Sequence, residues 1–221
     1  MYLYLSEGQS IPKDSLAINK FVVNVPDSVL QDLKTRLNNA KFVESIEGSN
    51  FRYGFNSNYL KQVVEFWKTK FDWRQQEKEL NKYNHFKTQI EGIDVHFVHV
   101  KPSKPAKTVV PLLLLHGWPG SFYEFYKSIP LLTEPVNDLA FEIVCPSIPG
   151  YGFSEAPHQE GMKFLIEIFN IYFYYLGFNI LHAARLFVKL MNRLGHKKFF
   201  VQGGDWGSGI GTVMSNLYPE K

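Results

Sequence analysis

One aspartate in this chain is surrounded by small residues, in the segment Gly203-Gly204-Asp205-Trp206-Gly207. The short apolar run at residues 199–202 follows the helix-stopping Gly195 and predicts a strand, and residues 208–218 predict the next helix. The small neighbours permit the tight backbone of a sharp strand-to-helix turn. The start of the helix places backbone N–H groups and a positive dipole end beside the carboxylate. We therefore expect Asp205 to be ionised and exposed on that turn.

A carboxylate on such a turn indicates nucleophilic chemistry. Unlike a serine, it is already anionic at neutral pH and needs no base for the first attack. Attack at a saturated carbon, such as that of an epoxide or a carbon–halogen bond, leaves an ester, which water must then hydrolyse with the help of a base. The alternative interpretation is that Asp205 only caps the following helix, a position in which aspartate is common.

A second candidate segment is His116-Gly117-Trp118-Pro119, which follows an apolar run at residues 109–115. Such a run is typical of a strand buried on both faces, so the segment lies at the carboxyl end of a parallel strand, where active sites of open α/β sheets gather. A backbone N–H at Trp118, together with that of Trp206, would form a two-donor oxyanion hole for ester hydrolysis. For His116 we expect a packed, structural role in the loop.

Both segments resemble the epoxide hydrolases of the α/β-hydrolase superfamily, and specifically the microsomal branch that includes insect juvenile hormone epoxide hydrolases. Asp205 stands where the nucleophile-elbow pattern Gly-x-Ser-x-Gly places serine. The resemblance runs from about residue 21 to residue 221. It implies that Asp205 is the nucleophile and that His116, Gly117 and Pro119 belong to a loop of the substrate pocket. Further matching segments are Phe51-Arg52-Tyr53-Gly54-Phe55, Asp72-Trp73-Arg74, His85-Phe86-Lys87-Thr88 and Tyr151-Gly152-Phe153-Ser154-Glu155.

The order of residues along the chain bears on activity. In this superfamily the nucleophile comes first, a second acid follows and a histidine comes last. The last histidine here is His196, ahead of Asp205, and the family's lid, with the tyrosines that protonate the epoxide oxygen, would lie beyond Lys221. We therefore expect an α/β-hydrolase fold truncated after the nucleophile strand and helix. An amino-terminal epoxide-hydrolase region at residues 1–85 would precede a partial core at residues 86–221, and this chain alone would form at most a trapped ester.

Residues 162–177 have no counterpart in the resemblance, and we expect an insertion there. Phe, Ile, Tyr, Leu, Asn and Lys dominate it. Because A/T-rich codons encode these residues, our hypothesis is intron sequence translated through an imperfect gene model. A membrane span over residues 164–181 is the alternative, but Glu167 and two asparagines would be expensive in a bilayer core. An interfacial or protein-buried helix fits the pattern better.

Composition and charge are those of an ordinary globular protein. The chain is 45% hydrophobic and 20% charged, and its formal net charge of +3 comes from charges of mixed sign, so nucleic-acid binding is not indicated. Its one cysteine, Cys145, permits no intrachain disulfide and ends an apolar run at residues 140–145, which predicts a buried strand residue. Metal-ligand spacing and a glycine-rich phosphate loop are absent from the sequence, which favours a mechanism with no cofactor and no metal.

The amino terminus has neither the apolar length nor the basic flank of a secretory signal. The resembled microsomal enzymes usually carry an anchor there and sit on the endoplasmic reticulum. The resemblance thus implies an endoplasmic-reticulum or microsomal membrane location. Either the first exon, which would encode the anchor, is missing or the chain belongs to a soluble variant, and we favour the missing exon.

Apolar spacing predicts the elements that hold these motifs. Three leucines at helical spacing follow Pro26-Asp27 and predict a helix, and residues 60–71 predict a second amphipathic helix, whose aromatic stripe we expect to be core. Alternating residues at 86–90 and 93–97 predict two strands joined by a turn. A third helix is predicted over residues 178–194, with Asn179 as its cap and Gly195 at its end.

The residues and the resemblance together favour hydrolysis of a small apolar epoxide to a vicinal diol through a covalent aspartyl ester. A non-catalytic fragment or pseudoenzyme is the alternative, and the missing downstream histidine favours it. A haloalkane dehalogenase shares the aspartate elbow, but its family lacks the long amino-terminal region seen in this chain.

Overall fold

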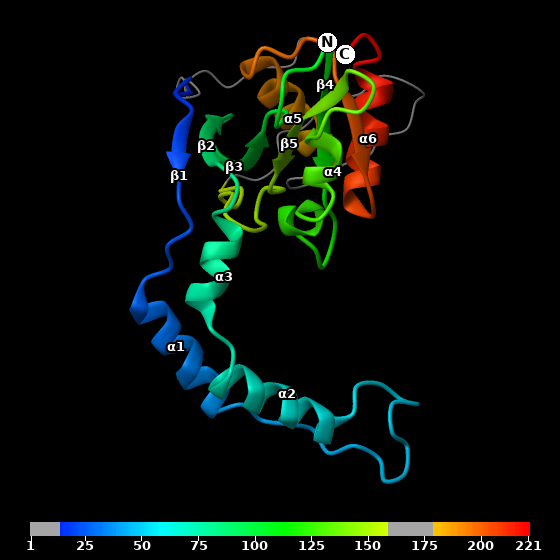
Figure 1. Cartoon of the computed structure of the whole chain (residues 1–221). Coiled ribbons are helices and arrows are strands. Elements are labelled where there is room, and N and C mark those ends of the chain that lie inside the picture. The colour runs from blue at the N-terminus through cyan, green and yellow to red at the C-terminus, as the bar shows by residue number, and fades with distance from the viewer. Residues whose placement is uncertain (1–13, 159–178) are drawn as a thin grey trace, which may run out of the picture. The chain divides into compact units, whose positions relative to one another are not determined.

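The computed structural model describes residues 14–158 and 179–221, which divide into two compact units. The sheet unit comprises the described parts of Met1–Val22 and Tyr83–Lys221, and the helical unit comprises Val23–Lys82. The predicted domain boundary between residues 85 and 86 stays a prediction. In chain order the elements are β1 (Asn19–Phe21), α1 (Asp27–Asn38), α2 (Ser57–Thr69), α3 (Trp73–Leu80), β2 (His85–Ile90), β3 (Ile93–Val100), β4 (Thr108–Leu115), the 3₁₀ helix η1 (Phe122–Phe125), α4 (Ile129–Thr133), β5 (Leu139–Pro146), α5 (Ile180–Arg193), β6 (Phe200–Gly203) and α6 (Trp206–Leu217) (Figure 1).

The described strands of the sheet unit form one sheet in the order β1-β2-β3-β5-β4-β6. β4 pairs in parallel with both β5 and β6, whereas β1, β2 and β3 are antiparallel to their neighbours. The near-continuous apolar run of β4 fits this central position, since helices cover both faces of a parallel sheet. Leu115 of β4 pairs with Gly203 of β6, so the loops that follow these two strands begin side by side.

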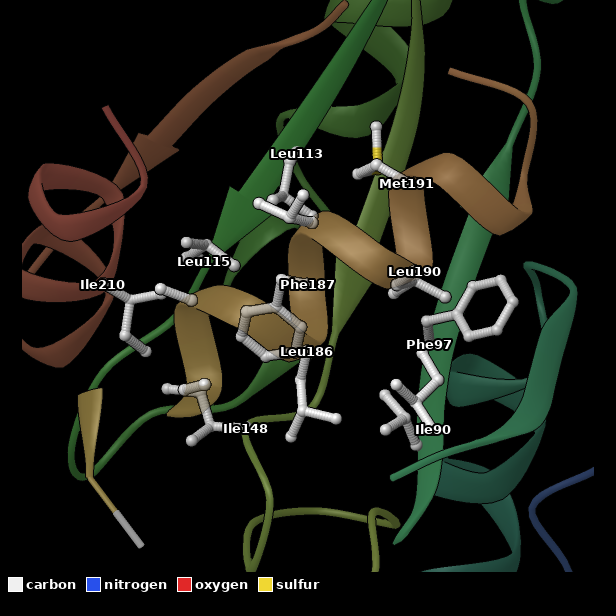
Figure 2. Close-up of a cluster of buried hydrophobic side chains, with 14 of the residues drawn as sticks. Ile90, Phe97, Leu113, Leu115, Ile148, Leu186, Phe187, Leu190, Met191 and Ile210 are labelled. Atoms are coloured by element: carbon white, nitrogen blue, oxygen red, sulfur yellow. The ribbon is translucent and has the colours of Figure 1, made fainter. Parts of the chain in front are cut away.

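An apolar core lies between the sheet and α5 with α6 (Figure 2). Phe187 and Leu190 of α5 are fully buried in it, together with Phe97 of β3, Leu113 of β4 and Ile210 of α6. Burial of such a side chain contributes about 1.5–3 kcal/mol. The core therefore fixes α5 and α6 on this face of the sheet, and α6 carries the turn that holds Asp205.

A charged contact ties α5 to the turn between β2 and β3. Glu91 and Gly92 form that turn, both with positive φ (54° and 75°). Arg185 of α5 donates hydrogen bonds of 2.7 and 2.6 Å to the two carboxylate oxygens of Glu91, and Lys189 lies 2.7 Å from one of them. Burial opposes ionisation of Glu91, but these two cations outweigh it and lower its pKa to about 2. The turn and the helix are thus locked by a half-buried ion cluster.

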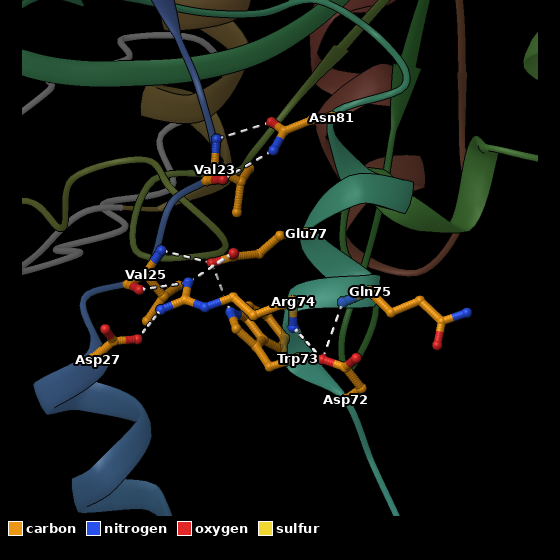
Figure 3. Close-up of polar contacts among 9 residues, drawn as sticks. All are labelled: Val23, Val25, Asp27, Asp72, Trp73, Arg74, Gln75, Glu77 and Asn81. Carbon is orange, nitrogen blue, oxygen red and sulfur yellow. Dashed lines mark hydrogen bonds and ion pairs between the residues drawn. The ribbon is translucent and has the colours of Figure 1, made fainter.

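In the helical unit, α3 holds the chain segment that leads into α1 (Figure 3). Arg74 donates to the carbonyl of Val25 at 2.8 Å and to Glu77 at 2.7 Å, while Glu77 accepts the N–H of Val25 at 2.7 Å. The side-chain amide of Asn81 both donates to and accepts from the backbone of Val23, each at 2.9 Å. Side chains therefore supply the backbone partners that a neighbouring strand would otherwise provide.

Most predicted elements are confirmed within two or three residues, including both predicted amphipathic helices of the helical unit. In the sheet unit, the side chain of Asn179 accepts the first N–H groups of α5, and Gly195 with φ 91° follows its end, as predicted. Cys145 is fully buried in β5, as predicted.

Ser121 and Glu124 have the spacing of a capping box in the sequence and so predict a helix that begins there, but this helix is only partly present. Ser121 accepts the N–H of Tyr123 at 3.3 Å, but the 3₁₀ helix η1 ends at Phe125, and α4 begins separately at Ile129. Pro130 lacks an N–H and its ring clashes inside a helix, so one continuous helix cannot pass through it.

The aromatic stripe of α2, which we expected to be core, is exposed among the described residues. The aromatic members of the predicted stripe, Trp67 in α2 and Phe71 just after it, are 43% and 39% exposed, and Ser57 is the buried residue of this helix. Helical periodicity reports which side chains share a face, and it does not by itself show that another element covers that face.

The predicted insertion at residues 162–177 and the membrane-associated helix considered there lie outside the described residues. Among the helices at residues 14–158 and 179–221, none is long and apolar enough to cross a bilayer.

Candidate active site

Asp205 lies on the turn between β6, which ends at Gly203, and α6, which begins at Trp206. Its backbone has φ 50° and ψ −124°, a conformation that costs a non-glycine residue of order 1–3 kcal/mol. The residue is exposed, and although it occupies the N-cap position, its side chain makes no capping hydrogen bond to α6. The turn is therefore strained, and the carboxylate does not serve as a side-chain cap of α6.

The glycines on either side of Asp205 are required by close backbone contacts. A Cβ atom at Gly203 would lie 2.4 Å from the carbonyl group of Gly207, and one at Gly207 would lie 2.1 Å from the carbonyl oxygen of Leu115. The obstructing atoms are backbone, which cannot rotate away. The turn is therefore packed directly against the carboxyl end of β4.

The loop after β4 reaches the carboxylate. The backbone N–H of Trp118 donates to Asp205 Oδ1 at 2.7 Å. A Cβ atom at Gly117 would lie 2.5 Å from Asp205 Cβ and 2.6 Å from Oδ1, so only glycine leaves room for the carboxylate. The side chains of Trp118 and Trp206 are 68% and 52% exposed, and Pro119 is exposed beside them. The structure thus brings four of the predicted site residues to the Asp205 carboxylate or to the surface around it.

The electrostatics of the turn favour the charged form of Asp205. The N–H of Trp118, followed by that of Trp206, lowers the pKa of Asp205 below its ordinary value, and burial opposes this only weakly. Both backbone amides that the sequence suggested for an oxyanion hole therefore act on this one carboxylate. Their part in ester hydrolysis stays a prediction.

Two known protein families match this chain, one in its amino-terminal half and one in its carboxyl-terminal half. Residues 18–125 match the family described as epoxide hydrolase N terminus, and residues 110–221 match the family described as alpha/beta hydrolase fold. The chain belongs to the α/β-hydrolase family. The predicted fold class and the predicted resemblance to microsomal-type epoxide hydrolases are confirmed.

Individual relatives show how much of the family's length is present. Epoxide hydrolase 1 of Sus scrofa is 50% identical over 210 residues, which cover 92% of this chain and 43% of that protein. Juvenile hormone epoxide hydrolase 1 of Ctenocephalides felis is 45% identical over 208 residues, covering 93% and 41%. The crystal structure of juvenile hormone epoxide hydrolase from the silkworm Bombyx mori matches with a TM-score of 0.82 at 38% identity, covering 94% of this chain and 51% of that one. The chain thus spans 43% and 41% of the first two relatives and about half of the crystallised one.

In this α/β-hydrolase, His116 is buried behind the loop rather than turned toward the carboxylate. Its Nε2 accepts the N–H of Ile148 at 3.0 Å, so the ring proton is on Nδ1, which lies 3.3 Å from the carbonyl oxygen of Gly117. Burial lowers the pKa of His116 below its ordinary value. The neutral ring links the loop after β4 to the loop after β5.

Glu124 is a second acid near the site, which the sequence alone led us to interpret only as part of a helix cap. A Cβ atom at Gly120 would lie 2.1 Å from Glu124 Oε2, so this carboxylate rests against the loop that carries Trp118. Burial, and then the charge of Asp205, raises the pKa of Glu124. The one feature of the sequence that could have pointed to Glu124 as a site residue was its position, a single turn after the loop that faces Asp205.

Proposed function

We propose that this chain carries the nucleophile and the oxyanion-binding amides of an epoxide hydrolase, which adds water to an apolar epoxide to give a vicinal diol. The observation that most directly supports this proposal is the 2.7 Å hydrogen bond from the Trp118 N–H to Asp205 Oδ1. This bond holds one carboxylate oxygen in place on an exposed turn, and Oδ2 is then the oxygen that attacks. The names of the relatives support the same class of reaction.

In the first step, Oδ2 of Asp205 forms a bond to a ring carbon of the epoxide while the bond between that carbon and the ring oxygen breaks. The ring oxygen leaves as an alkoxide and takes up a proton from an acid, a role that tyrosines fill in the resembled family. Because Asp205 is already ionised, this step needs no base. The product is an ester between Asp205 and the opened substrate.

In the second step, water attacks Cγ of the ester, and negative charge develops on Oδ1. This is the oxygen that already accepts the Trp118 N–H. Loss of one such donor in other hydrolases lowers kcat by about 10²–10³-fold. A base must take the proton of the water, and in the resembled family a downstream histidine paired with an acid does so. Collapse of the intermediate releases the diol and leaves the oxygen of the water in the Asp205 carboxylate.

The proposed substrate is a small apolar epoxide, because the exposed tryptophans Trp118 and Trp206 belong to the two segments that meet at the nucleophile. Juvenile hormone is one such epoxide, and two relatives carry its name. Association with the endoplasmic-reticulum membrane is proposed on the resemblance alone, and fractionation of cells that express the natural gene product would test it.

The first test is intact-mass spectrometry of the 221-residue chain after incubation with a small apolar epoxide. We expect a single adduct, mapped to Asp205 by peptide sequencing and lost in Asp205→Asn. The matched control is Asp138→Asn, since Asp138 is also an exposed aspartate with positive φ (64°), held by Lys107 at 2.7 Å. An adduct that persists in Asp205→Asn, or one that disappears in Asp138→Asn, would show that Asp205 is not the specific nucleophile.

The second test follows the oxygen atom. In a version extended by the downstream acid and histidine of the resembled family, and under single-turnover conditions in ¹⁸O-labelled water, ester hydrolysis places the label in the Asp205 carboxylate, whereas direct attack by water places it in the diol. Complete absence of an adduct from the unaltered chain would favour the non-catalytic alternative. Halide release from a chlorinated alkane without opening of an epoxide would favour a dehalogenase.

A further inference from the structure

Three side chains with metal-ligating atoms converge in the sheet unit, away from the turn that carries Asp205. They are His99 on β3, Glu142 on β5 and His196 in the loop after α5. His99 Nε2 lies 2.6 Å from Glu142 Oε1, and His196 Nε2 lies 3.5 Å from the same oxygen. The three ligand atoms all lie within 4.8 Å of one another. We propose that these residues form a binding site for a divalent transition metal, with zinc as the best-matched ion.

The backbone explains why these residues meet. β3 and β5 are antiparallel, and His99 is in register with Val144, so His99 shares a sheet face with Val144 and with Glu142 two residues earlier. Val144 belongs to the core under α5, which places the cluster on the α5 face. The positive φ of Gly195 reverses the chain at the end of α5, and the N–H of His196 then donates to the carbonyl of Met191 at 2.9 Å. Two strands and one helix end therefore fix the three ligands.

The donor set fits zinc chemically. Two imidazoles and one carboxylate are a recurring zinc ligand set, in which the bonds are about 2.0–2.2 Å long and the arrangement is tetrahedral. Ligand atoms around such an ion are about 3.3 Å apart. The separation of 3.5 Å between His196 Nε2 and Glu142 Oε1 is close to this value, whereas the 2.6 Å contact of His99 is a hydrogen bond. Zinc would replace that bond with a small outward shift of one imidazole, and water would fill the fourth position.

The state of His196 distinguishes this cluster from an ordinary ion pair. Its Nε2 is buried, points toward Glu142 and has no hydrogen-bond partner among the described residues. A buried ring nitrogen without a partner costs about 1–3 kcal/mol. A metal ion between His196 and Glu142 would satisfy it. A pair made only of His99 and Glu142 gives no reason for a second imidazole to be held there.

The test measures zinc directly and without any epoxide. After treatment with a chelator, the full 221-residue chain is titrated with zinc chloride by calorimetry, and with cobalt chloride by visible absorption. We expect one ion per chain and the visible bands of a tetrahedral cobalt site. His196→Ala and Glu142→Gln should each weaken binding at least about tenfold, since even residues that only support a ligand typically alter affinity by that factor.

His158→Ala is the matched control, because His158 also bonds a carboxylate, Glu155 at 2.7 Å, but lies on the surface with 65% of its side chain exposed. Its zinc affinity should equal that of the parent. Histidine modification of the unaltered chain gives a readout that needs no variant: zinc should protect His99 and His196 from an acylating reagent and leave His158 reactive. Absence of stoichiometric zinc binding, or binding that survives His196→Ala and protects neither His99 nor His196, would overturn the proposal.

Discussion

Gly117→Ala is the substitution that most directly tests the geometry around the nucleophile. The added Cβ would lie 2.5 Å from Asp205 Cβ and 2.9 Å from its Cγ. Carbon atoms in contact are ordinarily about 3.5–4.0 Å apart, so the Asp205 side chain must move by about 1 Å. That movement breaks or lengthens the 2.7 Å hydrogen bond from Trp118. The chemical groups of the site all remain present, and only their positions change.

The expected loss of reactivity at Asp205 follows from the displacement of its side chain. A misplacement of about 1 Å can reduce a reaction rate by about 10²-fold, so adduct formation at Asp205 should slow by about this factor. Stability should change less, by about 1 kcal/mol, the low end for overpacking, because the exposed Asp205 side chain has room to swing outward. Without the Trp118 N–H, the pKa of Asp205 should also rise toward its ordinary value.

The assay is the rate of single-turnover adduct formation followed by mass spectrometry across pH, with urea unfolding measured in parallel. The inflection of the rate at acidic pH should move to higher pH in Gly117→Ala. Gly209→Ala is the control, because its Cβ would meet Ile180 Cδ1 at an ordinary 3.7 Å, and it should stabilise α6 by about 0.5–1 kcal/mol with no change in rate. Equal rates and equal inflections in parent and Gly117→Ala would refute the assignment of Trp118 as the amide that holds the carboxylate.

Three further substitutions test the framework of the two units. Gly207→Ala should destabilise the chain by about 3 kcal/mol or more in urea unfolding, because its Cβ would lie 2.1 Å from the carbonyl oxygen of Leu115, which cannot rotate away. Glu91→Gln should remove a part of the folding stability that depends on pH. Because the pKa of Glu91 in the folded chain is about 2, below the ordinary 4.5, its contribution is complete above about pH 4.5 and is lost as the pH falls toward 2. In thermal unfolding across this pH range, the parent should show this loss and Glu91→Gln should not. Arg74→Ala leaves the nearly buried Glu77 without its cation and should lower the urea concentration at the unfolding midpoint, whereas Arg74→Lys should recover only part of this loss because lysine lacks the forked guanidinium.

The turn at Asp205 could be predicted from the sequence because its causes are local. A glycine on each side, a strand before and a helix after are all visible within about fifteen residues, and the steric reason for Gly207 is consistent with that pattern. The ends of α5 could be predicted for the same reason, since an asparagine cap and a glycine stop act on the adjacent turns of the helix.

Features that depend on distant residues could not be predicted in the same way. Ser121 and Glu124 have the spacing of a helix cap, and only the position of Pro130 further along shows that the helix is interrupted. The reason that residue 117 is glycine is a side chain from another strand-to-helix turn, that of Asp205, and nothing near Gly117 in the sequence reveals it. The three residues of the proposed metal site lie on separate elements and have no recognisable spacing, because strand pairing and a helix end bring them together.

The two amides at Asp205 have a use that the first chemical step alone does not explain. A carboxylate with an ordinary pKa near 3.9 is already ionised at neutral pH, so lowering its pKa further adds no reactive form. A lower pKa also makes an oxygen nucleophile intrinsically weaker, so in the attack on the epoxide these donors act against reactivity and contribute only orientation. In the proposed ester hydrolysis these donors favour the reaction instead, because the oxygen that accepts the Trp118 N–H gains negative charge as water adds. A donor that binds more strongly as charge develops accelerates that step. Disruption of the contact, as in Gly117→Ala of an enzyme that turns over, should therefore slow ester hydrolysis by a larger factor than ester formation.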